Sequence, residues 1–344
     1  ATPHPMHAEW AVKAAEAGKH MLVEKPIGLN APEARAMVDA AAKHDVFLME
    51  AFMYRCHPQM AKLVELVRGG TIGQVRLIRA SFCYFASFDA ASRAYNNDLA
   101  GGGILDVGCY PVSASRLVAG AAHGRPFLNP IDVKGAGHLG QTGVDEYAAA
   151  VLCFAGDIVA EVCAGVGLNM HESQTIEVFG SEGRIFIGDP WCPSRWNLSP
   201  AKILVKRHDE KAPQEILVEC ARDLYTCEAD MVADHIAERQ APAMPWDDTL
   251  GNMEALDRWR REVGLVYDQE QPARYASTIT RRPLRRKPDA AIPHGCIPGL
   301  DKPVARLVQG ADVNHTMPYT AIQFDEYFAC GGNAFDTSHA YGVP

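Results

Sequence analysis

The chain has 344 residues, of which 48% are hydrophobic and 22% charged, and its formal net charge is -9. This length predicts two or three domains of ordinary soluble composition. The acidic balance argues against a basic nucleic-acid-binding domain, and no apolar run is long enough for a membrane helix. The ten cysteines are scattered singly, with neither a C-x-x-C pair nor zinc-like spacing, which is typical of reduced thiols in a cytoplasmic protein.

The first 55 residues alternate between helical and strand patterns. Apolar residues recur at helical spacing over 8–17, and Met21-Leu22-Val23 fits a short buried strand. Asn30 starts a second helix with a capping-box pattern, and 46–49 is a second apolar run. This alternation predicts a parallel α/β sheet.

The pattern becomes β-rich after residue 55. A helix at 58–68 leads into strands, two of which are joined by a hairpin turn at Ala155-Gly156-Asp157. The predicted strands are 73–85, 144–154, 158–167, 174–180 and 184–188, and the further helices are 101–119, 223–239 and 248–264. These elements predict a second domain built on an antiparallel or mixed sheet.

A linker is predicted over residues 276–300, where a short basic run is interrupted by prolines. A nucleic-acid-binding patch is the alternative, which a single short run in an acidic chain disfavours. After it, 304–308 fits a strand, 318–330 a helix and 333–336 a second strand. Because the chain starts without Met and stops abruptly at Pro344, we interpret it as truncated at both ends.

The first candidate for chemistry is Glu24-Lys25-Pro26. It follows a predicted buried strand, and ligands of open α/β sheets bind at the carboxyl ends of strands. An ammonium there can hold a substrate hydroxyl or stabilise an alkoxide. The alternative is a solvated loop lysine, which the tripeptide by itself favours.

The second candidate is the segment 101–110 (GGGILDVGCY). Its three glycines allow another backbone or a ligand to approach closely. Asp106 and Tyr110 are four residues apart and share one helix face, so a carboxylate and a phenol near an ammonium could relay a proton. The alternative is that Asp106 caps a neighbouring segment and Tyr110 packs in the core. A third candidate, Arg55 with His57, flanks the predicted domain junction, where substrates often bind. The alternative is a structural role, which is the more common one for a lone arginine and histidine.

Three segments of the chain resemble the Gfo/Idh/MocA oxidoreductases in order and spacing, and the resemblance covers about residues 1–275. The segments are Glu24-Lys25-Pro26, 50–58 (EAFMYRCHP) and 101–111 (GGGILDVGCYP). The resemblance implies an α/β fold in which residues 1–55 are the C-terminal part of a Rossmann domain. Residues 56–275 then form an α+β domain for substrate binding, whose large open sheet mediates homo-oligomerisation.

The resemblance also implies roles for individual residues. Lys25 matches the family's catalytic lysine beside the nicotinamide, and Asp106 and Tyr110 match its substrate-binding and proton-shuttling pair. Tyr110, where other branches have histidine, resembles the branch of xylose, dihydrodiol and glucose–fructose oxidoreductases. Tyr110 would exchange the hydroxyl proton, with its pKa lowered by Lys25, while Asp106 and Arg55 bind substrate.

A turn near the N-terminus resembles the family's cofactor-contacting turn, with His4 in place of the usual asparagine. We therefore expect NAD or NADP as cofactor. The residues expected to contact it are Thr2, Pro3, His4, His7, Glu24, Lys25, Pro26 and Arg55. The family's glycine-rich pyrophosphate loop lies upstream of this turn and is not in the sequence. We therefore expect this chain to bind the cofactor weakly and to be inactive as a fragment.

Residues 301–344 resemble the start of an aldo/keto reductase, which is a (β/α)8 barrel. The matching segments are 306–310 (RLVQG) and 332–337 (GNAFDT) with Tyr341. The resemblance implies that Asp336 and Tyr341 are remnants of a catalytic pair. Because such a barrel needs about 250 residues, this segment is expected to be a barrel fragment without activity.

The leading functional hypothesis is hydride transfer between a nicotinamide and a sugar or polyol hydroxyl, from aldose to lactone or in reverse. One alternative is a non-catalytic dinucleotide-binding regulator, which has no need for Lys25, Asp106 and Tyr110 together. Another is a bifunctional fusion with an aldo/keto reductase. The expected partners are a carbohydrate substrate and further copies of the chain, with no nucleic acid, membrane or metal.

Overall fold

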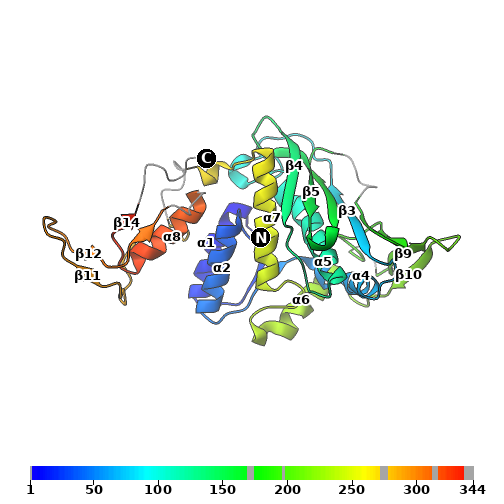
Figure 1. Cartoon of the computed structure of the whole chain (residues 1–344), viewed down its shortest axis with the longest axis horizontal. Coiled ribbons are helices and arrows are strands. Elements are labelled where there is room, and N and C mark those ends of the chain that lie inside the picture. The colour runs from blue at the N-terminus through cyan, green and yellow to red at the C-terminus, as the bar shows by residue number, and fades with distance from the viewer. Residues whose placement is uncertain (1, 169–173, 196–197, 272–277, 312–316, 337–344) are drawn as a thin grey trace.

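The computed structural model describes residues 2–168, 174–195, 198–271, 278–311 and 317–336 (Figure 1). A small N-terminal unit of helices and strands lies beside a large twisted sheet, and the C-terminal segment lies on the opposite side of that unit (Figure 1). None of the described helices combines the length and apolar character needed to cross a membrane.

The N-terminal unit has the predicted α/β arrangement. Strands β1 (Met21–Glu24) and β2 (Leu48–Ala51) pair in parallel, and helices α1 (His7–Glu16) and α2 (Ala31–Lys43) pack together beside them. Helix α2 begins at Asn30, whose side-chain oxygen accepts a hydrogen bond from the Glu33 N–H at 3.0 Å. The Glu33 carboxylate binds the Leu29 N–H at 2.9 Å instead of returning to Asn30, so half of the predicted capping box is confirmed.

The second unit is an eight-stranded mixed sheet in the order β10-β9-β8-β7-β3-β6-β5-β4. Its strands are β3 (Val75–Cys83), β4 (Asp132–Leu139), β5 (Asp145–Cys153), β6 (Val159–Gly165), β7 (Ile176–Gly180), β8 (Gly183–Ile187), β9 (Ala201–Arg207) and β10 (Gln214–Val218). Only the β3–β6 pair is parallel among these strands. The five predicted strands are confirmed. The edge strands β4 and β10 and the neighbouring strand β9 were not predicted. Strand β4 is mostly exposed and carries two glycines, so it lacks the alternating pattern of a half-buried strand.

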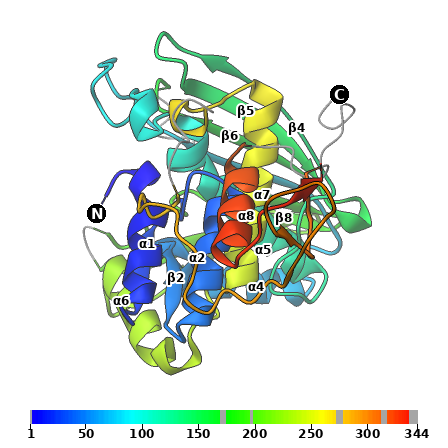
Figure 2. The same cartoon turned by 90° about the vertical axis from the view of Figure 1, so that its left-hand side faces the viewer.

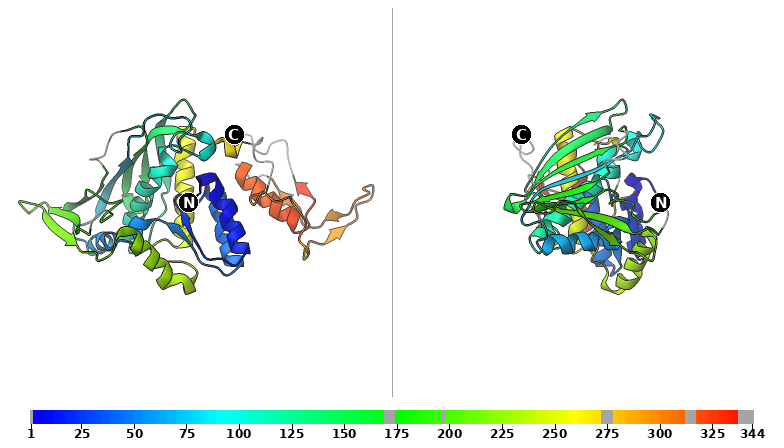
Figure 3. Two further views of the ribbon diagram at one scale, coloured as in Figure 1. Left: turned by 180° about the vertical axis from the view of Figure 1, so that it is seen from behind. Right: turned by 90° about the vertical axis from the view of Figure 1, so that its right-hand side faces the viewer.

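Helices cover one face of this sheet and leave the other open (Figure 3, right). The covering helices are α4 (Pro58–Arg68), α5 (Cys109–Ala122) and α7 (Trp246–Val263). Strand β5 illustrates the two faces: Ala148, Ala150 and Leu152 are buried, whereas Tyr147 and Val151 alternate with them and are exposed. The one-turn helix α3 (Met53–Cys56) packs against helix α6 (Leu224–His235).

Three consecutive glycines bring segments of the second unit into close contact, as the sequence predicted. A Cβ atom on Gly103 would lie 2.8 Å from the Cα of Gly165, and one on Gly102 would lie 2.2 Å from Oδ1 of the buried Asp145. Gly102 also has a φ of 103°, which side-chain-bearing residues rarely adopt. The glycines therefore allow the segment before Asp106 to lie directly against β5 and β6.

Gly102→Ala is expected to lower the free energy of unfolding by about 3 kcal/mol, because a steric clash adds to an unfavourable φ. Gly18→Ala is the matched control, since Gly18 has a φ of 68° but no atom within 4 Å of its Cβ position. Gly18→Ala should lower the free energy of unfolding by only about 1 kcal/mol. Urea denaturation of both variants checks this difference, and equal losses would contradict the proposed clash.

Helix α7 joins the two units. It packs against α2 of the N-terminal unit and against β4 and α5 of the second unit. Trp259, on this helix, is fully buried, and the buried apolar residues of both units form one continuous core.

The C-terminal segment forms a small unit, and its helix α8 (Met317–Ala329) packs against α2 (Figure 2). Its strands are two residues long: β11 (His294–Gly295) pairs with β12 (Val304–Ala305), and β13 (Gln309–Gly310) pairs in parallel with β14 (Phe335–Asp336). The predicted helix and second strand are confirmed. The predicted barrel fragment is wrong for the described residues, because two short ladders and one helix do not form a barrel wall. Asp336 is exposed, and Tyr341 lies outside the described residues.

Candidate active site

Lys25 lies just beyond the carboxyl end of β1, where the sequence predicted it. The following turn, which contains a cis Lys25–Pro26 peptide, is held from both sides. The Ile27 N–H donates to Oε1 of Glu50 at 2.9 Å, and Nδ1 of His7 lies 2.9 Å from the carbonyl oxygen of Pro26. Thus β2 and α1 both fix the position of the lysine.

Asp106 and Lys25 form a buried ion pair, with 3.1 Å between the lysine Nζ and the carboxylate Oδ1. Lys25 Nζ also donates to the backbone carbonyl of Asp106. Asp106 lies in a π-helical turn, η3 (Ile104–Gly108), which leads into α5. Burial lowers the pKa of Lys25, but the charge and hydrogen bond of Asp106 together with the effect of Cys109 outweigh it, so the pKa of the lysine lies above its usual value.

Two residues that the sequence did not single out complete the surroundings of Asp106. The Tyr84 hydroxyl donates to Oδ2 at 2.6 Å, and the Arg93 guanidinium pairs with the carboxylate through both terminal nitrogens. Burial raises the pKa of Asp106, but Lys25 and Arg93 together hold it well below its usual range. Asp106 is therefore ionised at any physiological pH.

Tyr110 takes a different position from the one expected for a proton shuttle. Its ring lies 5.0 Å below Nζ of Lys25, but its hydroxyl contacts Sδ of Met53 at 3.4 Å instead of Lys25 or Asp106. Burial raises the pKa of Tyr110 well above its usual value, so the expected lowering by Lys25 is not observed. Lys25 and Asp106 are brought together, and Tyr110 contributes its ring face to this pair.

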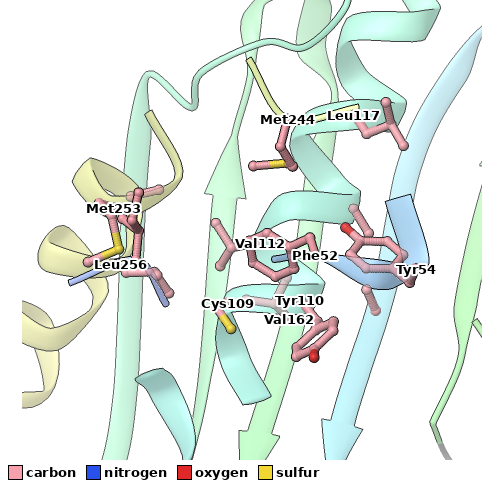
Figure 4. Packing of buried hydrophobic residues seen from close by; sticks show 14 of the residues in the cluster. Phe52, Tyr54, Cys109, Tyr110, Val112, Leu117, Val162, Met244, Met253 and Leu256 are labelled. Atoms are coloured by element: carbon pink, nitrogen blue, oxygen red, sulfur yellow. The ribbon is translucent and has the colours of Figure 1, made fainter. Parts of the chain in front are cut away.

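Aromatic rings surround Tyr110 on the remaining sides. Its ring centroid lies 5.2 Å from that of Phe52, 5.1 Å from Phe82 and 5.7 Å from Trp191. Figure 4 shows Phe52 and Tyr54 beside Tyr110 within the buried cluster. Trp191 stacks on Phe82 and is fully buried, although it comes from the loop after β8. The site therefore has a rigid apolar wall on the side away from Asp106.

The N-terminal turn approaches the same site. Nδ1 of His4 lies 3.2 Å from the carbonyl oxygen of Ala100, and burial lowers the pKa of His4 to about 3, so its imidazole is neutral. His7 contacts the carbonyl oxygens of Thr2 and Pro26 through its two ring nitrogens and is buried. His7 thus connects the N-terminal turn to the lysine turn, whereas Thr2 and Glu24 are exposed and Pro3 is half-buried.

Arg55 is not part of this site, which corrects the sequence prediction. Its guanidinium is buried and pairs with Asp248 on α7 at 2.8 Å, and it donates to Oγ of Ser113 at 3.0 Å. Asp248 pairs at 2.5 Å with a second buried cation, Arg116. His57 caps helix α4, and its Nδ1 accepts from the Gln59 N–H at 3.1 Å. Both residues of the third candidate therefore stabilise the junction of α3, α4, α5 and α7.

Glu50 is a further buried acid beside the lysine turn. Burial raises its pKa to about 8, and its Oε2 has no hydrogen-bond partner among the described residues. The group is therefore protonated at neutral pH in the folded protein and ionised in the unfolded chain. Since its folded pKa is the higher one, the stability that it contributes is present at low pH and is lost as pH rises toward 8.

Glu50→Gln should remove this dependence on pH while keeping an acceptor for the Ile27 N–H. Between pH 5 and 8, the stability of the wild type should fall relative to the variant by about 1 kcal/mol per pH unit. Urea denaturation at several pH values measures the difference between the two proteins. A constant difference across this range would mean that Glu50 ionises normally in the folded protein.

Comparisons with known proteins agree with this arrangement. Residues 60–186 match the family described as GFO/IDH/MocA C-terminal domain, and residues 1–52 match the oxidoreductase family with an NAD-binding Rossmann fold. The chain is also 30% identical over 278 residues to a trans-1,2-dihydrobenzene-1,2-diol dehydrogenase from Macaca fuscata fuscata, a match that covers 78% of each protein. The chain belongs to the Gfo/Idh/MocA family of oxidoreductases.

Other relatives in the Gfo/Idh/MocA family are similar over the same part of the chain. The trans-1,2-dihydrobenzene-1,2-diol dehydrogenase of Mus musculus is 29% identical over 280 residues, covering 79% of this chain and 78% of that protein. A 3-ketoreductase from Actinomadura kijaniata, solved with NADP, superposes with a TM-score of 0.65 at 26% identity, covering 76% of each chain. An aldose-aldose oxidoreductase from Caulobacter crescentus has the same fold, with a TM-score of 0.66 at 23% identity, covering 77% of this chain and 76% of that one.

As a Gfo/Idh/MocA protein, the chain is an NAD(P)-dependent oxidoreductase. The expected fold types, a partial Rossmann unit and a large open mixed sheet, are both confirmed. The expected aldo/keto reductase segment is not supported. The two family matches end at residue 186, and the relatives described above align with 76 to 79% of the chain.

Proposed function

We propose that this protein transfers hydride between a nicotinamide cofactor and a CH–OH group of a sugar or other vicinal diol. The observation that carries the proposal is the Lys25–Asp106 ion pair at the carboxyl end of β1, against the ring of Tyr110. A pair of this kind places a proton donor and a hydroxyl acceptor side by side at a buried site. The Macaca and Mus musculus relatives are diol dehydrogenases by name, which supports a diol or sugar substrate.

The N-terminal unit offers a suitable place for the cofactor. The first residue of α1, His7, contacts the turn after β1, so the start of this helix and the end of the strand lie at the same edge. Dinucleotides bind at such an edge in α/β sheets. Thr2, Pro3 and Lys25 would face the cofactor, which supplies or accepts the hydride when bound. We propose NADP or NAD, since the 3-ketoreductase relative was solved with NADP.

Lys25 would carry the proton transfer. Its raised pKa keeps it protonated at neutral pH, so it can donate a proton to the oxygen of a carbonyl substrate as hydride reaches the carbon. Oxidation of an alcohol requires the lysine to accept that proton and is favoured at high pH. Asp106 would orient the substrate by accepting from a hydroxyl. Tyr110 could take part in the transfer only after its hydroxyl leaves Met53.

Because the sequence does not contain the glycine-rich pyrophosphate loop, the experiment that tests this function supplies that loop as an N-terminal fusion. It follows the absorbance of NADPH and NADH with a panel of ketoses, aldoses and cyclic vicinal diols. Hydride transfer with members of the panel is expected, with reduction faster near neutral pH. Cofactor binding without turnover on any member would reject the proposal in favour of a dinucleotide-binding regulator.

We also propose that the open face of the sheet joins copies of the chain. Tyr147 and Val151 on β5 are exposed on this face. Phe85, which follows β3 on the other side of β6, is 62% exposed. Exposed apolar groups on a flat sheet favour association. Sedimentation velocity should detect a dimer or larger oligomer, and a purely monomeric protein at micromolar concentration would reject this interface.

A further inference from the structure

Every acceptor position of Asp106 is already in use. Its Oδ1 binds Lys25 at 3.1 Å and Arg93 at 2.8 Å, and its Oδ2 binds Tyr84 at 2.6 Å and Arg93 at 3.1 Å. A carboxylate has about four lone-pair directions, and these four contacts occupy them. A substrate hydroxyl can therefore bind Asp106 only if one of the three side chains moves away.

Arg93 is the partner that can leave at the lowest cost. Only 14% of the Lys25 side chain is exposed and its Nζ is also bonded to the Asp106 carbonyl, and Tyr84 is half-buried directly after β3. Arg93 instead lies in the turn region before η3, and 53% of its side chain is exposed to solvent. A substrate hydroxyl can take the place of Arg93 because Lys25 and Tyr84 remain on the buried carboxylate, so Asp106 keeps a counter-charge and a hydrogen-bond donor.

The charges at the site then favour one class of substrate. Lys25 and Arg93 carry two positive charges against the single negative charge of Asp106, and the nearby imidazole of His4 is neutral. Besides burial, the charge of Glu24, the exposed residue before Lys25, contributes to the raised pKa of Tyr110 and of Glu228 on α6, but Glu24 forms no ion pair with Lys25 or Arg93 among the described residues. An Arg93 side chain displaced from Asp106 would leave a fork of N–H donors at the site without an anionic partner.

We propose that Arg93 is a substrate-binding residue with two positions. In the free enzyme it pairs with Asp106. When a substrate hydroxyl takes its place on Asp106, Arg93 binds an anionic substituent of the same substrate. The preferred substrate is then a polyol bearing a phosphate or a carboxylate. This inference rests on the proposed function for the identity of the site, and it adds the charge of the substrate. A planar guanidinium suits both anions because it can bind two of their oxygens at once.

The test is isothermal titration calorimetry of the full chain with glucose, glucose 6-phosphate and glucuronate, which needs no turnover. The wild type is expected to bind at least one anionic sugar more tightly than glucose. Arg93→Gln should weaken that binding by about 10- to 100-fold, the range for loss of a hydrogen bond to a charged group, and leave glucose binding unchanged or tighter. Arg93→Lys should recover part of the loss, because it keeps the charge without the fork.

Arg79→Gln is the matched control. Arg79 has the same 53% side-chain exposure and is also paired with a carboxylate, that of Glu161, but it lies on the open face of the sheet. The Arg79→Gln variant should have unchanged affinities for glucose, glucose 6-phosphate and glucuronate. Comparison of glucose 6-phosphate with glucuronate identifies which anion is preferred. The inference is supported if either sugar binds more tightly than glucose and that difference depends on Arg93.

Two results would overturn it: no anionic sugar binding more tightly than glucose, or an Arg93→Gln loss that is equal for charged and neutral sugars. These results are separable from failure of the proposed function. Discrimination by Arg93 without hydride transfer would reject the oxidoreductase activity and keep the anion site. Hydride transfer with sugars, together with an affinity for anionic sugars that Arg93→Gln leaves unaffected, would keep the oxidoreductase activity and reject the anion site.

Discussion

Lys25→Ala is expected to lower kcat for hydride transfer by about 10²- to 10⁴-fold, the usual contribution of a positioned acid or base. The lysine Nζ lies between Asp106 and the ring of Tyr110, so its loss removes the buried proton donor beside the expected substrate oxygen. Stopped-flow measurement of NADPH oxidation under single-turnover conditions would isolate the chemical step. Binding of substrate should weaken much less, because Tyr84 still holds Asp106 in place.

Two further variants make this prediction specific. Lys25→Arg keeps the positive charge but cannot release its proton, so it is expected to remain nearly inactive while folding normally. Lys62→Ala removes a lysine in an exposed pair with Glu65 and should be fully active. A Lys25→Ala enzyme within tenfold of the wild-type rate would show that another group transfers the proton.

Asp248→Asn is expected to lower the free energy of unfolding by about 3–5 kcal/mol, the largest stability effect that we predict. Its carboxylate is fully buried between the guanidinium groups of Arg55 and Arg116, which are themselves buried. The amide keeps the shape of the side chain but leaves two cations in a low-dielectric interior without a counter-charge. Urea denaturation at pH 7 measures this loss directly.

Asp45→Asn is the control for the same chemical change at the surface. Asp45 pairs with Arg239 at 2.8 Å, but its side chain is largely exposed. Its replacement should cost less than about 1 kcal/mol, because water already screens the pair. If Asp248→Asn costs no more than this control, the buried cations must find other compensation, such as the Asn129 side chain that binds Arg116.

Local patterns were sufficient to predict much of the fold. The capping residue Asn30, the alternation along β5 and the glycines before Asp106 each have a cause that lies within a few residues of sequence. The place of Lys25 was also predictable, since a polar residue directly after a parallel strand lies at the binding edge of an α/β sheet. The prediction that this strand is buried holds only for Met21, because Leu22 and Glu24 are exposed. These features do not depend on how distant segments meet.

The remaining parts of the site depend on contacts between distant segments. Tyr84 reaches Asp106 from 22 residues away, and Trp191 reaches Tyr110 from 81 residues away, so no spacing rule could place them. The assignment of Arg55 to the site failed for the same reason, because its partner Asp248 lies 193 residues further along the chain. Tyr110 and Asp106 share a helix face, but the aromatic cluster turns the phenol toward Met53.

Helix α7 is distant from the N-terminal unit in sequence but packs against it in space. This helix follows the whole open sheet in sequence, yet it packs against α2 as well as against β4. A chain that ends before Trp246 would therefore not contain an N-terminal unit that folds by itself. Its two-stranded sheet of β1 and β2 would lack helix α7, which lies some 200 residues later in the sequence. Exchange of this unit between relatives, by recombination or by design, has to carry α7 along or rebuild its contacts with α2.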